Sequence, residues 1–150
     1  MLTTLHWIPL TEPGALAISA RPRGGDGLQE DLKAWQGVGV QTVVSALELD
    51  EEIYLDMDSE PDLCARLGLS FVRFKVSDRG VPSLDSSSCE FVNGLAARIR
   101  DGERIAVHCR MGIGRSGLLC AAILVALGFD ADEAFLRVES ARGLRVPDTR

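Results

Sequence analysis

The sequence has few cysteines, and their spacing suggests neither a metal site nor a disulfide framework. Only four occur among 150 residues, at Cys64, Cys89, Cys109 and Cys120, without the paired spacing of metal ligands. Their density is also far below that of a disulfide scaffold, so reduced thiols are expected. A small metal-bound or disulfide-stapled fold is therefore excluded.

Long hydrophobic runs and positive net charge are also lacking. The longest apolar run, 118–129, is shorter than the roughly 20 residues of a membrane span and favours a buried helix. Because no basic segment precedes a long apolar stretch at the start, no secretory signal is expected and a cytoplasmic location is predicted. The net charge of −6 argues against nucleic acid and membrane partners, although a local basic pocket could bind phosphate.

The chain shows no repeat, low-complexity tract or long linker, so residues 1–150 are expected to form one domain. Strand-like segments alternate with segments of helical periodicity, which predicts an α/β fold. The strand-like segments are 15–19, 41–47, 69–76 and 104–109, and the helical segments are 28–36, 59–67, 85–100, 115–127 and 131–141. Asp85 and Asp130 are candidate helix N-caps, because a short carboxylate can accept from amides of the first turn.

Two further groups of side chains have a structural interpretation. The acidic stretch ELDEE at 48–52 is interpreted as a solvated loop or helix start. The aromatic residues Trp7, Trp35 and Tyr54 are interpreted as packing groups rather than as binding platforms.

The stretch HCRMGIGRSG at 108–117 follows a predicted strand and opens a predicted helix. Its glycines have the spacing of a dinucleotide-binding fingerprint. That motif requires a second strand ending in an acidic residue about 20 positions later, where this sequence has helical character instead. A Walker loop fits poorly, because Arg115 stands where lysine precedes the serine.

Phosphoryl transfer through a cysteine fits the same stretch better. Cys109 supplies a nucleophile, and Arg115 supplies a planar, permanently charged fork for phosphate oxygens. A free thiol has a pKa of about 8.5, so loop amides, the helix N-terminus and Arg115 must lower the pKa of Cys109. Ser116 can donate toward the sulfur, while His108 is expected to position the cysteine backbone. The phosphate-binding residues are predicted to be Arg110, Met111, Gly112, Ile113, Gly114 and Arg115.

The stretch HCRMGIGRSG resembles the signature loop of cysteine-dependent protein tyrosine and dual-specificity phosphatases, in which His-Cys is followed by five residues, Arg and Ser or Thr. VSDRGVPS at 76–83 resembles the general-acid loop of compact members similar to the cyclin-dependent-kinase-associated phosphatase. ARGLRVPDT at 141–149 is similar to small bacterial phosphatases of this type. The resemblance implies a cysteine-phosphatase-like α/β fold with a central, mainly parallel sheet flanked by helices.

The resemblance also implies a mechanism in which Asp78 protonates the leaving oxygen while Cys109 attacks phosphorus. Asp78 then accepts a proton from the water that hydrolyses the phosphocysteine, and no metal or organic cofactor is required. Asp85 is the nearest alternative acid but suits a helix cap better. The expected partner is a phosphoprotein or phosphopeptide substrate.

Two departures limit the resemblance. Related phosphatases have a water-positioning glutamine shortly after a segment like VPDT, whereas this sequence stops at Arg150. Either that function is absent, in which case hydrolysis of the intermediate is expected to be slow, or a further tail supplies the glutamine. The chain is also too small for the recognition elements of large tyrosine phosphatases. Five arginines are assigned no catalytic role. Of these, Arg23, Arg79 and Arg110 could face the substrate, and Arg142 and Arg145 could support the signature loop.

Several functions stay open at this point. Phosphotyrosine is the favoured substrate group, and phosphoserine and phosphothreonine are alternatives. Phosphoinositides fit less well, because the signature loop has no lysine for additional phosphates. The other classes are a catalytically silent phosphate-binding module and, remotely, a nucleotide-binding oxidoreductase. The sequence gives no indication of oligomeric state.

Overall fold

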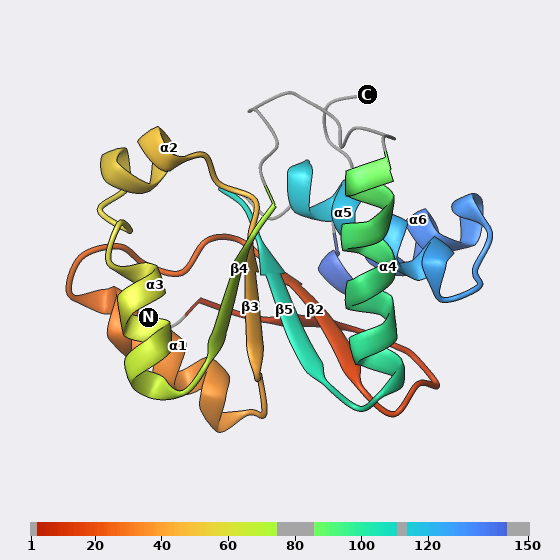
Figure 1. Ribbon diagram of the computed structural model, residues 1–150, viewed down its shortest axis with the longest axis horizontal. Coiled ribbons are helices and arrows are strands. Elements are labelled where there is room, and N and C mark those ends of the chain that lie inside the picture. Colours follow the sequence, from red (N-terminus) through yellow and green to blue (C-terminus); the bar gives the residue numbers. More distant parts are fainter. Residues whose placement is uncertain (1–2, 75–85, 111–113, 144–150) are drawn as a thin grey trace.

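A five-stranded sheet forms the centre of the molecule (Figure 1). The computed structural model describes residues 3–74, 86–110 and 114–143. The strands are β1 (His6–Ile8), β2 (Ala15–Ser19), β3 (Thr42–Ser45), β4 (Ser70–Arg73) and β5 (Arg104–His108). They lie in the order β1-β2-β5-β3-β4, with β1 antiparallel to β2 and all other neighbours parallel. The predicted α/β fold with a mainly parallel sheet is confirmed.

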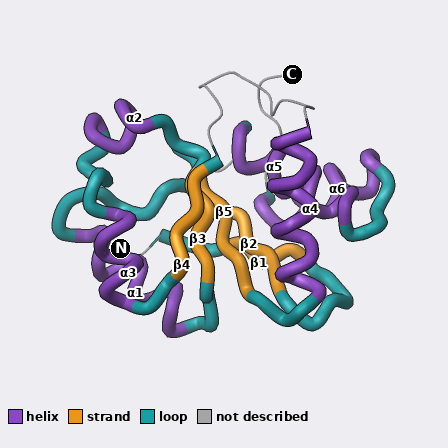
Figure 2. The backbone as a smooth tube through the Cα atoms, viewed as in Figure 1, coloured by secondary structure: helices purple, strands orange, loops and turns teal. Residues whose placement is uncertain are grey.

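Helices cover both faces of this sheet (Figures 1 and 2). The helices are α1 (Gly27–Gly37), α2 (Leu49–Tyr54), α3 (Glu60–Leu67), α4 (Ser86–Arg100), α5 (Arg115–Ala126) and α6 (Ala131–Arg142). One face packs against α1 and α3, and the other packs against α4, α5 and α6. All five predicted helices are present within about two residues of their expected ends. No described helix is long and apolar enough to cross a membrane.

The two hydrophobic cores follow from the alternation of side chains along each strand. In β2, Leu16 and Ile18 face the core under α4 to α6, whereas Ala17 faces the core under α1 and α3. In β3, Val44 and Val43 divide between the same two cores. Burial on both faces explains why these strands read as continuous apolar runs in the sequence.

β1 is the strand that the sequence analysis missed. It has only three residues and pairs with β2 at the sheet edge, so its length is too small for a periodic pattern to show. Ile8 is buried, and the Arg104 guanidinium lies 4.6 Å from the centroid of the Trp7 ring. The packing role predicted for Trp7 is confirmed.

One of the two predicted N-caps lies within the described residues. Asp130 precedes α6, and its Oδ1 accepts from the backbone amide of Glu133 at 2.8 Å, as expected. Asp85 lies outside the described residues.

The cysteines outside the signature loop differ in their environments. Cys64 and Cys120 are buried and free, as expected, and burial raises the pKa of each thiol, to about 12 for Cys64. A packing role like that of Cys64 and Cys120 does not hold for Cys89, which is exposed on α4.

The carboxyl ends of the four parallel strands lie side by side at one end of the sheet. Backbone hydrogen bonds join the segments that follow them: Ala46 donates to His108 at 2.9 Å, and Phe74 donates to Ser45 at 2.8 Å. Ligand sites of parallel α/β sheets form at this end, where the segments that follow several strands converge. The signature loop follows β5 here.

Candidate active site

Cys109 and Ser116 meet where β5 ends and α5 begins. Cys109 is only 2% exposed and Ser116 is fully buried, and Sγ and Oγ lie 3.2 Å apart. Gly114 is the N-cap of α5, so the serine lies in the first turn of a 12-residue helix. The partial positive charge of that helix end favours an anion there. The predicted hydroxyl-to-sulfur contact is therefore present, whereas Met111, Gly112 and Ile113 lie outside the described residues.

Arg115 is held in place by a carboxylate that the sequence analysis did not identify. Its Nη1 donates to Glu51 Oε1 at 2.5 Å and its Nη2 donates to Glu51 Oε2 at 3.0 Å. Nη1 also donates to the carbonyl of Ala46 at 3.1 Å. Burial alone would raise the pKa of Glu51, but the bonds from Arg115 and from the Glu48 amide outweigh it and lower that pKa. Arg115 thus has a fixed, charge-assisted partner on α2.

The acidic stretch at 48–52 is a helix start, as expected, but the expectation that it is solvated is wrong for Glu51 and Glu52. Glu51 is 13% exposed in its side chain and Glu52 only 2%. Glu52 accepts two hydrogen bonds of 2.7 Å from Arg73 at the end of β4. Two consecutive glutamates of α2 therefore bind arginines from two different elements, Arg115 of α5 and Arg73 of β4. No pattern in the sequence indicated these pairs.

His108 has a buried carboxylate partner as well. Its Nε2 lies 2.8 Å from Glu60 Oε2, and both side chains are fully buried. Trp35 packs with its ring centroid 6.2 Å from that of the imidazole, so its predicted packing role is confirmed. Within the described residues, Glu60 Oε1 and His108 Nδ1 have no hydrogen-bond partner. The expected positioning role of His108 thus involves Glu60, a residue that helical periodicity alone would place on an ordinary polar face.

Tyr54 contradicts the packing role predicted for it. Its side chain is 78% exposed at the end of α2, and the Arg110 guanidinium lies 5.6 Å from the ring centroid. Arg110 directly follows Cys109 and is itself exposed. The pair forms part of the rim beside the signature loop.

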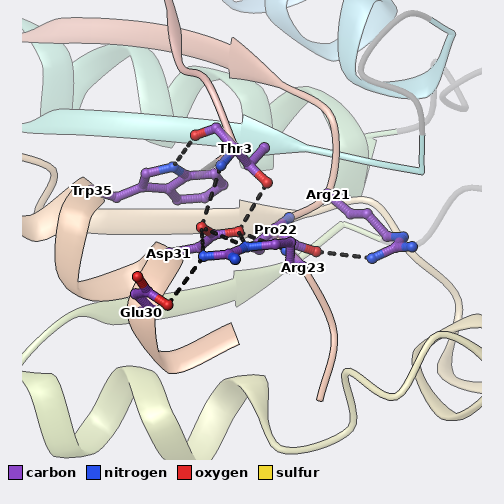
Figure 3. Close-up of polar contacts among 7 residues, drawn as sticks. All are labelled: Thr3, Arg21, Pro22, Arg23, Glu30, Asp31 and Trp35. Carbon is purple, nitrogen blue, oxygen red and sulfur yellow. Dashed lines mark hydrogen bonds and ion pairs between the residues drawn. The ribbon is translucent and has the colours of Figure 1, made fainter. Parts of the chain in front are cut away.

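Arg23 pairs with two carboxylates of α1. Its guanidinium donates to Asp31, and its Nη2 also lies 3.4 Å from Glu30 (Figure 3). The side chain of Asp31 is fully buried, and its hydrogen bonds from Arg23 and Thr3 outweigh the effect of burial and lower its pKa. Arg142 Nη1 lies 3.2 Å from His6 Nε2. Arg79 and Arg145 lie outside the described residues.

Asp78 also lies outside the described residues, so its catalytic role stays a prediction. The segment that carries it leaves β4 after Arg73 and the buried Phe74, whose ring stacks on Phe91 of α4 at 4.7 Å. In the part of the chain that the structure describes, no group of three His, Cys, Asp or Glu side chains could hold a metal ion. The expectation that the reaction requires no metal also stays a prediction.

A family model described as the DSP-PTPase phosphatase of polymorphic toxin systems matches residues 18–129. The chain belongs to the DSP-PTPase phosphatase family. This family consists of cysteine-dependent protein phosphatases, so the resemblance of the signature loop is confirmed. The helix that follows α5, in place of the strand of a dinucleotide fold, agrees with this assignment.

Individual relatives agree with the family. The zebrafish (Danio rerio) protein tyrosine phosphatase domain-containing protein 1 is 37% identical over 83 residues, covering 55% of this chain and 11% of the relative. Human (Homo sapiens) cyclin-dependent kinase inhibitor 3 is 25% identical over 118 residues, covering 79% of this chain and 55% of the relative. The chain thus spans about half the length, or much less, of these curated relatives.

The fold has a close counterpart among solved structures. A kinase-associated phosphatase whose catalytic cysteine is replaced by serine superposes with a TM-score of 0.88, at 21% identity, covering 99% of this chain and 89% of that chain. At that level of identity the likeness concerns the fold, and it confirms the predicted cysteine-phosphatase-like architecture.

Proposed function

We propose that this chain hydrolyses phosphomonoesters on proteins, with phosphotyrosine as the favoured group and phosphoserine and phosphothreonine as alternatives. The observation that carries the proposal is the 3.2 Å contact between Cys109 Sγ and Ser116 Oγ at the N-terminus of α5, with Arg115 in the same turn. A nucleophile, a hydroxyl donor to it and a fixed guanidinium are the groups that the reaction needs. A cytoplasmic location and a single domain belong to the same proposal.

In the first step, the Cys109 thiolate forms a bond to phosphorus as the bond to the leaving oxygen breaks. Asp78 gives that oxygen its proton, and Arg115 together with the loop amides holds the negative charge of the three other oxygens. In the second step, water attacks phosphorus, Asp78 takes the proton from the water, and sulfur leaves as a thiolate. A hydrogen bond from the Ser116 hydroxyl stabilises that leaving sulfur.

Glu51 and Glu60 act as positioning residues in this scheme. Glu51 fixes the plane of the Arg115 fork, so that its donors face the phosphate without a search through rotamers. Glu60 fixes the ring of His108, whose backbone carbonyl is bound by Ala46 and whose next residue is the nucleophile. Neither glutamate touches the reacting atoms.

Hydrolysis of an aryl phosphate in the presence of a chelator, compared between the wild type and Cys109→Ser, tests the proposal. Turnover that is present in the wild type and absent in the variant supports it. Turnover that survives in Cys109→Ser means that the nucleophile is misassigned. A folded wild type that binds phosphate without turnover is a silent phosphate-binding module instead.

A panel of phosphorylated substrates tests the substrate class separately. We expect phosphopeptides to have a higher kcat/KM than inositol phosphates, because the signature loop holds no lysine for additional phosphates. A reversed order would assign the enzyme to phosphoinositides.

A further inference from the structure

The segment that follows β2 carries an arginine, Arg21, beside the signature loop. β2 and β5 are parallel neighbours, and Ser19 pairs with His108 at their carboxyl ends. The two chains stay together beyond the strands, because the amide of Arg21 donates to the carbonyl of Arg110 at 3.4 Å. Arg21 therefore lies next to the residue that follows the proposed nucleophile.

A buried carboxylate fixes the segment around Arg21 (Figure 3). Asp31 accepts from the amide of Arg23 at 2.7 Å, from its Nη2 at 3.0 Å and from Thr3 Oγ1 at 2.9 Å. The charge of Arg23 is neutralised in this cluster, and its guanidinium is turned toward α1. Because the backbone on both sides is anchored, the position of Arg21 beside the loop is built into the fold.

The side chain of Arg21 takes no part in that cluster. Figure 3 shows its guanidinium pointing away from Asp31, and its Nη1 donates to the carbonyl of Pro22 at 3.1 Å. No described carboxylate lies within ion-pair distance of Arg21. Its charge is thus available to a ligand in the part of the site that the structure describes.

Like Arg21, Arg110 has no carboxylate partner among the described residues. It is exposed, its guanidinium lies over the ring of Tyr54, and among the described residues no carboxylate pairs with it directly. The nearby Glu51 has both of its oxygens bound to Arg115. In a chain of net charge −6, two arginines without a carboxylate partner flank the backbone next to Cys109.

We propose that Arg21 and Arg110 form a subsite for a carboxylate side chain of the phosphoprotein substrate, next to the phosphorylated residue. The proposal rests on the proposed function, because the phosphate in the signature loop brings the flanking residue to this rim. Guanidinium forks bind carboxylates in planar, two-point geometry. The substrate class is therefore a phosphopeptide segment with an aspartate or glutamate beside the phosphorylated position.

Two phosphotyrosine peptides test this subsite, one with aspartate and one with asparagine on both sides of the phosphotyrosine. We expect the wild type to hydrolyse the acidic peptide with a kcat/KM about five-fold higher, the size expected for two exposed ion pairs. Arg21→Gln should reduce this ratio to about two, leave aryl phosphate turnover unchanged and weaken the salt dependence of the ratio.

Arg66→Gln is the matched control. Arg66 is exposed near the end of α3, just before β4 begins. It therefore lies at the amino ends of the parallel strands, whereas Cys109 lies at their carboxyl ends. The substitution removes the same charge, so it should leave the acidic preference intact. An equal loss of preference in both variants would mean that net charge, and not a subsite, is responsible, which overturns the proposal.

The remaining outcomes also decide. A wild type without acidic preference, or an Arg21→Gln variant that retains the full preference, overturns the subsite while the phosphatase function stands. If the folded wild type turns over no aryl phosphate, the proposed function fails, and calorimetric binding of the two peptides to Cys109→Ser decides the subsite. Tighter binding of the acidic peptide then supports it, and equal or absent binding overturns it.

Discussion

Replacing Glu51 tests the idea that α2 holds Arg115, the proposed catalytic arginine, in place. Glu51→Ala removes both carboxylate oxygens that accept from Arg115, whose side chain is only 5% exposed and also donates to the Ala46 carbonyl. The backbone amide of Glu48 also loses its acceptor at 2.9 Å. The substitution therefore perturbs the site and the start of α2 together.

The magnitude follows from the burial of the pair. Breaking a buried ion pair costs about 3–5 kcal/mol, and the partial exposure of Glu51 places this pair near the lower end, at about 3 kcal/mol. For a chain of this size, a loss of about 3 kcal/mol lowers the Tm by about 9 °C. Because a misplaced Arg115 no longer meets the phosphate oxygens, kcat/KM for aryl phosphate should fall about 100-fold. Glu51→Gln keeps one acceptor oxygen, so its loss of free energy of unfolding should be about half of that expected for Glu51→Ala.

Chemical unfolding and aryl phosphate kinetics of the same variants provide the assay. Asp58→Asn is the control, because Asp58 is exposed just before α3 and the substitution removes the same charge. We expect the control to be within about 0.5 kcal/mol of the wild type. A Glu51→Ala variant as stable and as active as that control would refute the reasoning.

The pH dependence of this effect has a definite sign. The pKa of Glu51 is lowered in the folded protein, so its stabilising contribution is complete above the unfolded pKa of about 4.3. The contribution is lost as the pH falls through the folded pKa. The difference in free energy of unfolding between the wild type and Glu51→Gln should therefore be constant near neutral pH and shrink under acid conditions.

Three further substitutions have expected outcomes. Glu60→Leu leaves His108 without its acceptor and should lower the free energy of unfolding by about 3 kcal/mol. Glu60→Gln should cost less and should mainly change the pH profile of kcat/KM. Identical profiles in the wild type and Glu60→Gln would limit Glu60 to a structural role. Ser116→Ala should enlarge the pre-steady-state burst by slowing breakdown of the phosphocysteine, and an unchanged burst would contradict its role at the sulfur. Asp78→Asn should depress turnover far more than Asp85→Asn, and equal losses would mean that the general acid is misassigned.

The sequence predicted the fold well because the buried strands and helices are periodic over many residues. The strand expected at 15–19 is β2 residue for residue, and the apolar run at 118–129 lies mainly in the buried α5. β1 and α2 were missed or incompletely described because each is too short for periodicity to emerge. Their existence depends on contacts with distant parts of the chain.

The candidate site divides in the same way. Cys109, Arg115 and Ser116 were found because the signature loop brings them together within eight consecutive residues. Glu51 and Glu60 were missed because the residues that they bind lie 64 and 48 positions away along the chain. A glutamate reads as solvated in the sequence unless its partner is known, and a buried partner is a property of the folded chain.

Three of the buried carboxylate pairs, Glu51 with Arg115, Glu52 with Arg73 and Glu60 with His108, also constrain how this chain can diverge. A single replacement on either side leaves an uncompensated polar or charged group in the interior, whereas a paired replacement by apolar side chains can be tolerated. Among relatives that share this arrangement, the two positions of each pair should therefore change together. Because Arg115 is also proposed to bind phosphate, we expect the pair of Glu51 and Arg115 to change least and the pair of Glu52 and Arg73 to change most freely.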